Sequence, residues 1–213
     1  MALKVVVFGP AGDVGTVAVE SALLAGHQVT AFIHQTPLPD HLTDKVTVVK
    51  GDVYNTDEVS SAIQGCDGVL VALGRGSDFS ATTLFSDGTR NIVAGMKEHG
   101  VKRIVICNSS FIFYERIPLM FRLLGLEPIA EDHKRQVAVL REIASELDWI
   151  VVCPPRITGA AFTGAYEVVE DQAPSSSKCS KFHVADLMVK CLSGDDHLQK
   201  CIGCGDSEGC SVS

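Results

Sequence analysis

Three glycines near the start of the chain stand at a spacing that suits the binding of a pyrophosphate. Gly9, Gly12 and Gly15 directly follow the apolar run 3–8, and an alanine-rich, helical stretch continues to Ala25. Gly9 permits a tight turn, Gly12 removes the Cβ where a phosphate would approach, and Gly15 lets a helix pack closely on the strand. The phosphates would then lie among unpaired N–H donors at a helix N-terminus. Because the required strand precedes the loop and the helix follows it, a dinucleotide site is favoured over a plain glycine turn.

Polar and glycine residues follow two further apolar runs, at positions that would share one edge of a parallel sheet. After the third run, Asp52 offers a carboxylate to an adenine amino group, with Val53 beside it; a helix N-cap accounts for Asp52 equally well. After the fourth run, Leu73, Gly74 and Arg75 allow the backbone to approach a ribose or pyrophosphate closely. A simple turn is the alternative there.

Hydroxyl groups and an imidazole follow the fifth apolar run, where a nicotinamide ring would lie. Cys107, Asn108 and Ser109 come directly after that run. A serine without an identified general base is usually a hydrogen-bonding residue, so Ser109 is expected to orient the ring or relay a proton. His133, which is predicted to open the following helix, is the second catalytic candidate. A solvated histidine in a first helical turn is its alternative.

The segment after the sixth run, together with two phenylalanines, is expected to hold the substrate. Pro154 belongs to a rigid proline pair that projects Arg156 into the same edge, which favours a ligand contact over a solvated arginine. Arg156 would pair with a propionate or a phosphate. Phe111, Phe113 and Ile157 would pack against the faces of a flat ligand.

One absence bears on the chemistry. Short-chain dehydrogenases that act on alcohols need a tyrosine four residues before a lysine, because the lysine lowers the pKa of the phenol. None of the three tyrosines, Tyr54, Tyr114 and Tyr166, has a lysine at that spacing. A hydride acceptor that stabilises its own charge, such as a flavin or a conjugated tetrapyrrole, needs mainly to be positioned.

Strand-length apolar runs alternate with helix-length segments, which predicts an α/β fold with a doubly wound parallel sheet of the Rossmann type. We expect one dinucleotide-binding domain over residues 1–195, followed by a flexible, Cys-containing tail over 196–213. The irregular apolar segment 110–130 is interpreted as a lid over the substrate, with a core-packing connection as the alternative. The other predicted strands are residues 28–33, 46–50, 68–72, 103–107 and 149–153.

Composition excludes several classes of protein. A length of 213 residues with 46% hydrophobic content fits one domain. No apolar run approaches the roughly 20 residues of a membrane span, and a net charge of -8 offers no footprint for nucleic acid or anionic membranes. Eight scattered cysteines fit free thiols in a soluble cytoplasmic protein. A flexible tail with reduced cysteines is favoured over a zinc site, whose ligands would be His197, Cys201, Cys204 and Cys210.

Four further segments, at residues 88–94, 96–101, 154–155 and 163–166, resemble the biliverdin reductase B family of NADPH-dependent flavin reductases, which are atypical short-chain dehydrogenases. The resemblance implies a monomer that binds NADPH, with NADH as a possible coenzyme. It also implies reduction of flavins (FMN, FAD, riboflavin), biliverdin-type tetrapyrroles and other quinonoid acceptors. The coenzyme contacts that it implies are Gly9, Gly12, Val14, Gly15, Asp52, Val53, Leu73, Gly74, Phe85, Cys107 and Asn108, with Ser109 and His133 beside the reactive ring.

The chain departs from this family at coenzyme positions. Ala11 and Val14 stand where the family has threonines, so this loop would rely on backbone donors. His34 replaces an arginine, and a neutral imidazole offers a 2′-phosphate one hydrogen bond and no charge. These departures bear on the preference between NADPH and NADH. Three further replacements are Leu38 and Gly76 for arginines and Arg156 for a pocket histidine.

The alternative function belongs to a different class, a non-catalytic dinucleotide sensor that resembles the NmrA-type regulators and acts through a protein partner. That family also has a glycine-rich loop and does not need the tyrosine–lysine pair. The chain shows no second, partner-binding domain, which favours the enzyme.

Overall fold

The computed structural model describes residues 1–76, 78 and 80–207. Its central sheet has eight strands in the order β3-β2-β1-β4-β5-β6-β10-β8, and every neighbouring pair is parallel except β10 and β8. Two short strands, β7 and β9, pair separately. The strands are β1 (Lys4–Phe8), β2 (Gln28–Ile33), β3 (Thr47–Lys50), β4 (Gly68–Val71), β5 (Arg103–Cys107), β6 (Asp148–Cys153), β7 (Arg156–Thr158), β8 (Tyr166–Glu170), β9 (Lys178–Ser180) and β10 (Lys200–Asp206).

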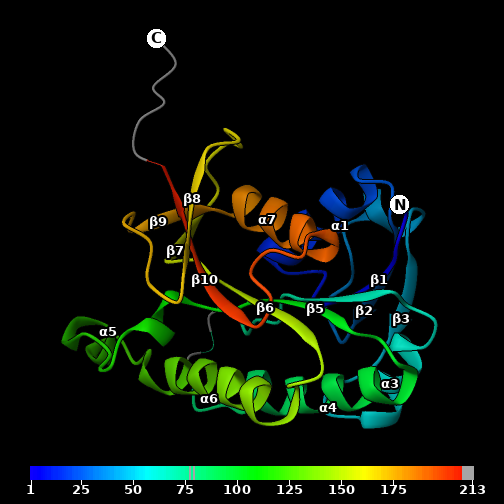
Figure 1. Cartoon of the computed structure of the whole chain (residues 1–213), viewed down its shortest axis with the longest axis horizontal. Helices are drawn as coiled ribbons and strands as arrows, with labels where there is room; N and C mark the ends of the chain where they lie inside the picture. The colour runs from blue at the N-terminus through cyan, green and yellow to red at the C-terminus, as the bar shows by residue number, and fades with distance from the viewer. Residues whose placement is uncertain (77, 79, 208–213) are drawn as a thin grey trace.

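Helices cover both faces of this sheet, because its central strands are apolar on both sides. Figure 1 shows α1 and α7 over one face and α3, α4 and α6 over the other. The helices are α1 (Asp13–Leu24), α2 (Asp40–Thr43), α3 (Thr56–Ile63), α4 (Leu84–His99), α5 (Leu119–Leu123), α6 (Glu127–Ile143) and α7 (Lys181–Ser193), with a 3₁₀ turn, η1, at Ser110–Phe113. The predicted doubly wound α/β fold is therefore confirmed.

Strand β1 shows how one strand serves two cores. Successive side chains of a strand point to opposite faces. Val5 and Val7 are buried in the core under α1 and α7, whereas Val6 and Phe8 are buried in the core under α3, α4 and α6. Both faces of β1 are thus covered by helices. The chain leaves the strand at its carboxyl end, after Phe8, and turns sharply into α1.

The C-terminal segment contradicts the sequence interpretation. Residues 196–207 are not a flexible tail, because β10 (Lys200–Asp206) lies inside the sheet, parallel to β6 and antiparallel to β8. Cys201 and Cys204 are almost fully buried in it. Cys210 lies outside the described residues. Among the residues that are described, none of the helices combines the length and apolarity that crossing a membrane requires.

The segment 110–130 is only partly irregular. It contains η1, the short α5 and the start of α6, and Phe111 packs edge-on against Phe121 of α5 with ring centroids 5.1 Å apart. Four apolar side chains of this segment remain exposed to solvent: Leu119, Met120, Leu123 and Leu124.

Candidate functional site

The glycine loop lies in the turn between β1 and α1, beside the carboxyl end of β4. Gly9 has a φ of 80°, in the left-handed region, and a Cβ there would overlap the carbonyl of Ala72. A Cβ on Gly15 would overlap the carbonyl of Gly9, so the loop and α1 could not approach as they do. Both positions therefore need glycine for packing reasons alone.

The N-terminus of α1 is open to an anion. Around Gly12, the nearest atom to a Cβ built there is the Gly9 carbonyl oxygen at 3.6 Å, which leaves room in front of the helix. Within the described part of the chain no side chain caps α1, so its first N–H groups are available to a phosphate. Val14 is buried in the core, so only its backbone faces this space, while Ala11 is half-buried.

A cation that the sequence analysis missed lies next to this loop. Lys181, at the start of α7, and Asp13 help to line a cavity of about 340 Å³ beside Ala11 and Gly12. The Lys181 Nζ is 3.9 Å from an Asp13 carboxylate oxygen, so it offsets the acidic charge at the helix N-terminus. The sequence around Lys181 contains no motif that indicates a coenzyme contact, because Lys181 reaches the loop only through the packing of α7 on α1.

The ends of β2 and β3 bring two predicted coenzyme residues together. The His34 Nε2 lies 3.7 Å from an Asp52 carboxylate oxygen, and both side chains are largely exposed. The N-cap of α3 is Asn55, so the N-cap role considered for Asp52 is wrong. Asp52 instead accepts the Tyr54 N–H at 3.0 Å, which leaves part of its carboxylate free. Leu38 is buried and does not face this site.

The two coenzyme residues predicted in the turn after β4, Gly74 and Arg75, differ in how accessible they are to a ligand. No atom of the described residues lies within 4 Å of a Cβ built on Gly74, so its surroundings among them are open. Arg75 is different, because its guanidinium donates to Asp78 at 2.5 Å and to the Ser80 carbonyl at 2.7 Å. These bonds hold the guanidinium within its own turn. Val53 and Leu73 both lie close to Gly88 of α4.

A buried polar network fixes the segment after β5. The Asn108 Nδ2 donates to the Gln136 Oε1 at 2.7 Å and to the His133 carbonyl at 3.2 Å, and its Oδ1 accepts the Ser109 N–H at 2.6 Å. Gln136 in turn donates to Thr89 at 2.8 Å. The side chain of Asn108 therefore has a structural role, because its hydrogen bonds join the end of β5 to α6. The neighbouring Cys107 thiol stays neutral, since burial raises its pKa to about 12.

His133 lies in the second turn of α6, which begins at Glu127, and not at the start of the helix as predicted. Its ring stacks on Phe85 with centroids 4.1 Å apart and an interplanar angle of 22°. The Nδ1 is buried and has no hydrogen-bond partner among the described residues. Burial lowers the pKa of this imidazole to about 4, so it is neutral at physiological pH.

Asp132, which precedes His133, was not assigned a role from the sequence. Its side chain is fully buried and accepts hydrogen bonds from the Phe85 N–H at 2.9 Å and the Ser86 hydroxyl at 2.5 Å. Arg135 donates to the same carboxylate at 3.2 Å. Asp132 thereby satisfies one N–H in the first turn of α4 and holds Phe85 beneath the imidazole. The sequence shows Glu131 and Asp132 directly before His133, but it does not show that Asp132 binds the start of α4.

Ser109 caps the turn η1. Its Oγ accepts the Phe111 N–H at 3.3 Å, and no described residue accepts its O–H. Phe113 packs against the core under α6. Arg156 and Ile157 are exposed at the start of β7, and Arg156 makes no ion pair or hydrogen bond within the described ranges. Pro154 is buried and its carbonyl accepts the Ser110 N–H.

The zinc set considered for the tail cannot form. Cys201 and Cys204 point to opposite faces of β10, because one packs in the core under α6 and the other in the core under α7. His197 is engaged by Glu170, with 2.6 Å between its Nδ1 and the carboxylate.

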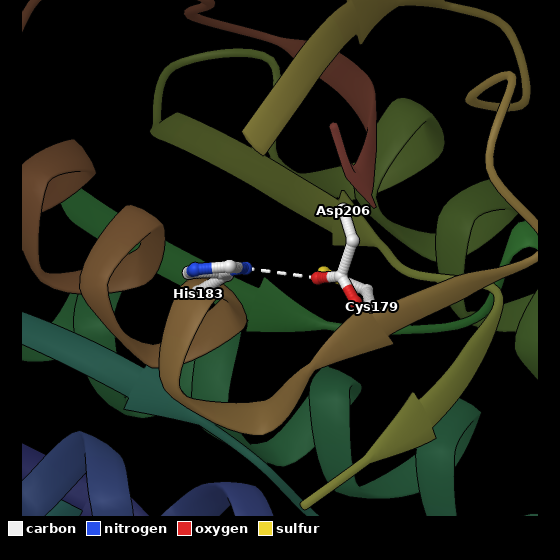
Figure 2. A group of neighbouring side chains, drawn as sticks. All are labelled: Cys179, His183 and Asp206. Atoms are coloured by element: carbon white, nitrogen blue, oxygen red, sulfur yellow. Dashed lines mark hydrogen bonds and ion pairs between the residues drawn. The ribbon is translucent and has the colours of Figure 1, made fainter. Parts of the chain in front are cut away.

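Cys179, His183 and Asp206 lie close enough together to suggest a metal site, as Figure 2 shows. The His183 Nδ1 is 2.9 Å from Asp206, and its Nε2 accepts the backbone N–H of Thr163 at 3.0 Å. The backbone donor thus requires a bare Nε2 and places the proton on Nδ1. With both ring nitrogens engaged and the pKa of the Cys179 thiol raised by its contact with Cys204 and by burial, the cluster reads as a structural link between β10 and α7.

Tyr166 meets a lysine in space although not in sequence. The Lys190 Nζ is 3.2 Å from its hydroxyl, yet that hydroxyl donates to Asp186 at 2.6 Å. Burial and Asp186 raise the pKa of the phenol, which is the opposite of what the dehydrogenase dyad requires. The pair lies between β8 and α7, away from the glycine loop.

An open parallel sheet, a glycine loop that only glycine can form and an uncapped helix N-terminus at the strand ends define a dinucleotide-binding domain of the doubly wound class. Residues 9–195 match the family model described as NAD(P)H-binding. The chain belongs to this NAD(P)H-binding family.

Three known proteins show how far the similarity extends. A 3-beta-hydroxysteroid dehydrogenase of Mycolicibacterium neoaurum is 31% identical over 121 residues, which is 51% of this chain but only 32% of that enzyme. A short-chain dehydrogenase/reductase of Veillonella parvula in complex with NADP superimposes with a TM-score of 0.80 at 16% identity, over 98% of this chain and 96% of that one. A candidate NADH-flavin reductase of Streptococcus pneumoniae also gives 0.80, at 18% identity over 97% and 100%. At these identities the two structures establish the fold alone.

Proposed function

We propose that the protein is an NAD(P)H-dependent reductase that acts on flavins such as FMN, FAD and riboflavin, or on biliverdin-type tetrapyrroles, in the manner of biliverdin reductase B. The observation that carries this proposal is the arrangement after β5. Ser109 has a hydroxyl proton that no described residue accepts, Asn108 links Ser109 to the backbone of a neutral His133 stacked on Phe85, and no tyrosine–lysine dyad of lowered pKa occurs among the described residues. Such a site positions ligands and lacks a strong proton donor. It suits an acceptor that stabilises the charge it receives.

The residues at the strand ends fit a dinucleotide. The space before Gly12 and the uncapped N–H groups of α1 would hold the pyrophosphate, and Lys181 would add positive charge nearby. His34 and Asp52 would face the adenosine end. We propose NADPH as the coenzyme, with NADH accepted, because His34 neither repels a 2′-phosphate as a carboxylate would nor binds it as an arginine would. The coenzyme supplies the hydride; the protein supplies orientation.

The residues around the reacting ring have separate tasks. The Ser109 Oγ can donate its proton outward, either to a carboxamide oxygen or towards the acceptor, because the Phe111 N–H already occupies one of its lone pairs. The His133 ring carries no charge, and its buried Nδ1 has no hydrogen-bond partner among the described residues, so the ring would offer the site a neutral surface. Arg156 is an exposed cation that can pair with a phosphate or propionate on the acceptor. The relatives support this reading through their names, an NADP complex and a candidate flavin reductase.

The decisive experiment follows the loss of NADPH absorbance in the near ultraviolet, first with FMN and then with biliverdin as acceptor. Ser109→Ala should lower turnover at least tenfold while the dissociation constant of NADPH changes less than twofold, since the hydroxyl lies near the ring end and not the phosphates. Ser145→Ala, at an exposed position near the end of α6, is the matched control. Tight NADPH binding without reduction of any acceptor would contradict the proposal.

A dinucleotide sensor of the NmrA-like type is the second candidate. The exposed apolar side chains of α5, Leu119, Met120 and Leu123, are the observation that favours it, because a protein partner could cover them. A sensor would bind the coenzyme and leave it unoxidised. The same assay therefore separates the two functions.

A further inference from the structure

A cavity of about 480 Å³ lies on the α6 face of the sheet, apart from the glycine loop. It is bounded by η1, by one side of α6, by the segment 171–173 after β8 and by the start of β10. Of the residues considered for coenzyme or acceptor, only Phe113 lines it. The full lining is Ile112, Phe113, Lys134, Val137, Arg141, Asp171, Gln172, Ala173 and Cys201.

The cavity has an apolar wall and a cationic rim. Lys134, Val137 and Arg141 occupy positions i, i+3 and i+7 of α6, so they form one stripe along the helix. Val137 is buried, and Ile112 and Phe113 continue the apolar surface from η1. A ligand in this cavity would therefore meet hydrocarbon on one side and positive charge on the other.

The charged groups of the lining are engaged to different degrees. Asp171 is balanced from outside the cavity, because the Lys200 Nζ lies 2.9 Å from its carboxylate and the Cys201 N–H donates to it at 3.3 Å. Lys134 is partly used by Glu131, at 3.3 Å. The Arg141 guanidinium makes neither an ion pair nor a hydrogen bond in the part of the chain that the structure describes, although its charge acts on Asp171 from a longer range. Arg141 is therefore the charged group of the lining that is left to pair with a ligand, and its charge points to an anionic one.

We propose that this cavity binds an amphipathic organic anion, with its apolar body against Phe113 and Val137 and its carboxylate, sulfonate or phosphate on the guanidinium of Arg141. The volume lies within the range of small-molecule sites, about 300–1,000 Å³. A guanidinium presents a planar fork of donors that matches such acid groups, and Gln172 adds an amide at the same rim. The site is independent of the proposed reductase activity.

The test uses 1-anilinonaphthalene-8-sulfonate, an apolar ring system with one sulfonate, titrated by fluorescence into the full chain with saturating NADP⁺ present. We expect one bound molecule per chain. Arg141→Gln should raise its dissociation constant about fivefold, which corresponds to about 1 kcal/mol, a size suited to a charge partner that is exposed. Arg90→Gln is the matched control, since Arg90 is an exposed arginine on α4 that does not line the cavity.

A second variant tests the cavity and not the charge. Ala173→Trp places a large ring in the lining while leaving Arg141 unchanged, and it should abolish binding. Thermal unfolding of each variant establishes that it is folded. The proposal is overturned if the probe is displaced by NADP⁺, if it binds nowhere, or if either cavity variant binds it as the wild type does.

Discussion

His133 should make the stability of the protein fall as the solution becomes acidic. Burial against Phe85 lowers the pKa of its imidazole from the usual 6.5 to about 4 in the folded state. The unfolded chain then binds more protons than the folded one at any pH below about 6.5. Stability from this group is complete above that pH and is lost as the pH falls towards 4. Between pH 7 and pH 5 the loss comes to about 2 kcal/mol, at about 1.4 kcal/mol for each unit of pKa difference.

The variant His133→Phe isolates this contribution, because a phenyl ring can keep the stack on Phe85 but cannot take up a proton. Urea unfolding at pH 7 and pH 5 gives the free energy of unfolding at each pH. The wild type should lose about 2 kcal/mol more than the variant on going to pH 5. At pH 7 the variant should be at least as stable, since it removes a buried Nδ1 without a partner. The exposed His34→Phe serves as the control. Equal pH dependence in wild type and His133→Phe would refute the reasoning.

Three further changes test the two ends of the proposed site. Gly15→Ala should reduce NADPH affinity in a calorimetric titration at least tenfold, because its Cβ overlaps the Gly9 carbonyl, whereas Gly159→Ala, whose Cβ would meet no atom of the described residues, should leave that affinity unchanged. Arg156→Ala should raise the KM for FMN about tenfold or more and barely affect lumiflavin, since a hydrogen bond to a charged group contributes about 1.5–3 kcal/mol; equal effects on both flavins would remove Arg156 from phosphate recognition. His34→Arg should strengthen NADPH binding while NADH affinity stays constant, because an arginine can pair with the 2′-phosphate that NADH lacks; an unchanged ratio of the two affinities would assign the 2′-phosphate to another cation.

The central parallel strands β1, β4, β5 and β6 could be predicted from the sequence because they are buried on both faces and form continuous apolar runs. The predicted bounds of the second and fifth strands, 28–33 and 103–107, are those of β2 and β5. The last strand could not be predicted in this way. Two of its seven residues are Gly203 and Gly205, which interrupt the apolar run. The structure shows why they are there: a Cβ at either position would press into the segment around Pro174 that crosses the strand.

The candidate site was predictable where it depends on the local chain and unpredictable where it depends on a distant element. The placement of the glycine loop, His34 and Asp52 at strand ends follows from the rule that ligands bind at the carboxyl ends of parallel strands; the close approach of His34 to Asp52 appears only in the structure. Arg75 was assigned to the coenzyme because the aspartate three residues later was not considered as its partner. Asp132 binds the start of α4, about fifty residues earlier, and such a contact exists only in the folded chain.

The packing of α1 on α7 makes folding of this domain strongly non-local. The apolar face of α1, with Val17 and Ala18, shares its core with Val184 and Met188 of α7, so the first helix finds its partner some 170 residues later. Contacts across so long a loop carry a large entropic cost before they form, which slows folding. Until α7 docks, the helix that begins at the glycine loop has no cover on one side. A fragment that ends before α7 would therefore keep the loop sequence and lose the surface that holds it in place, and its exposed apolar face would favour aggregation.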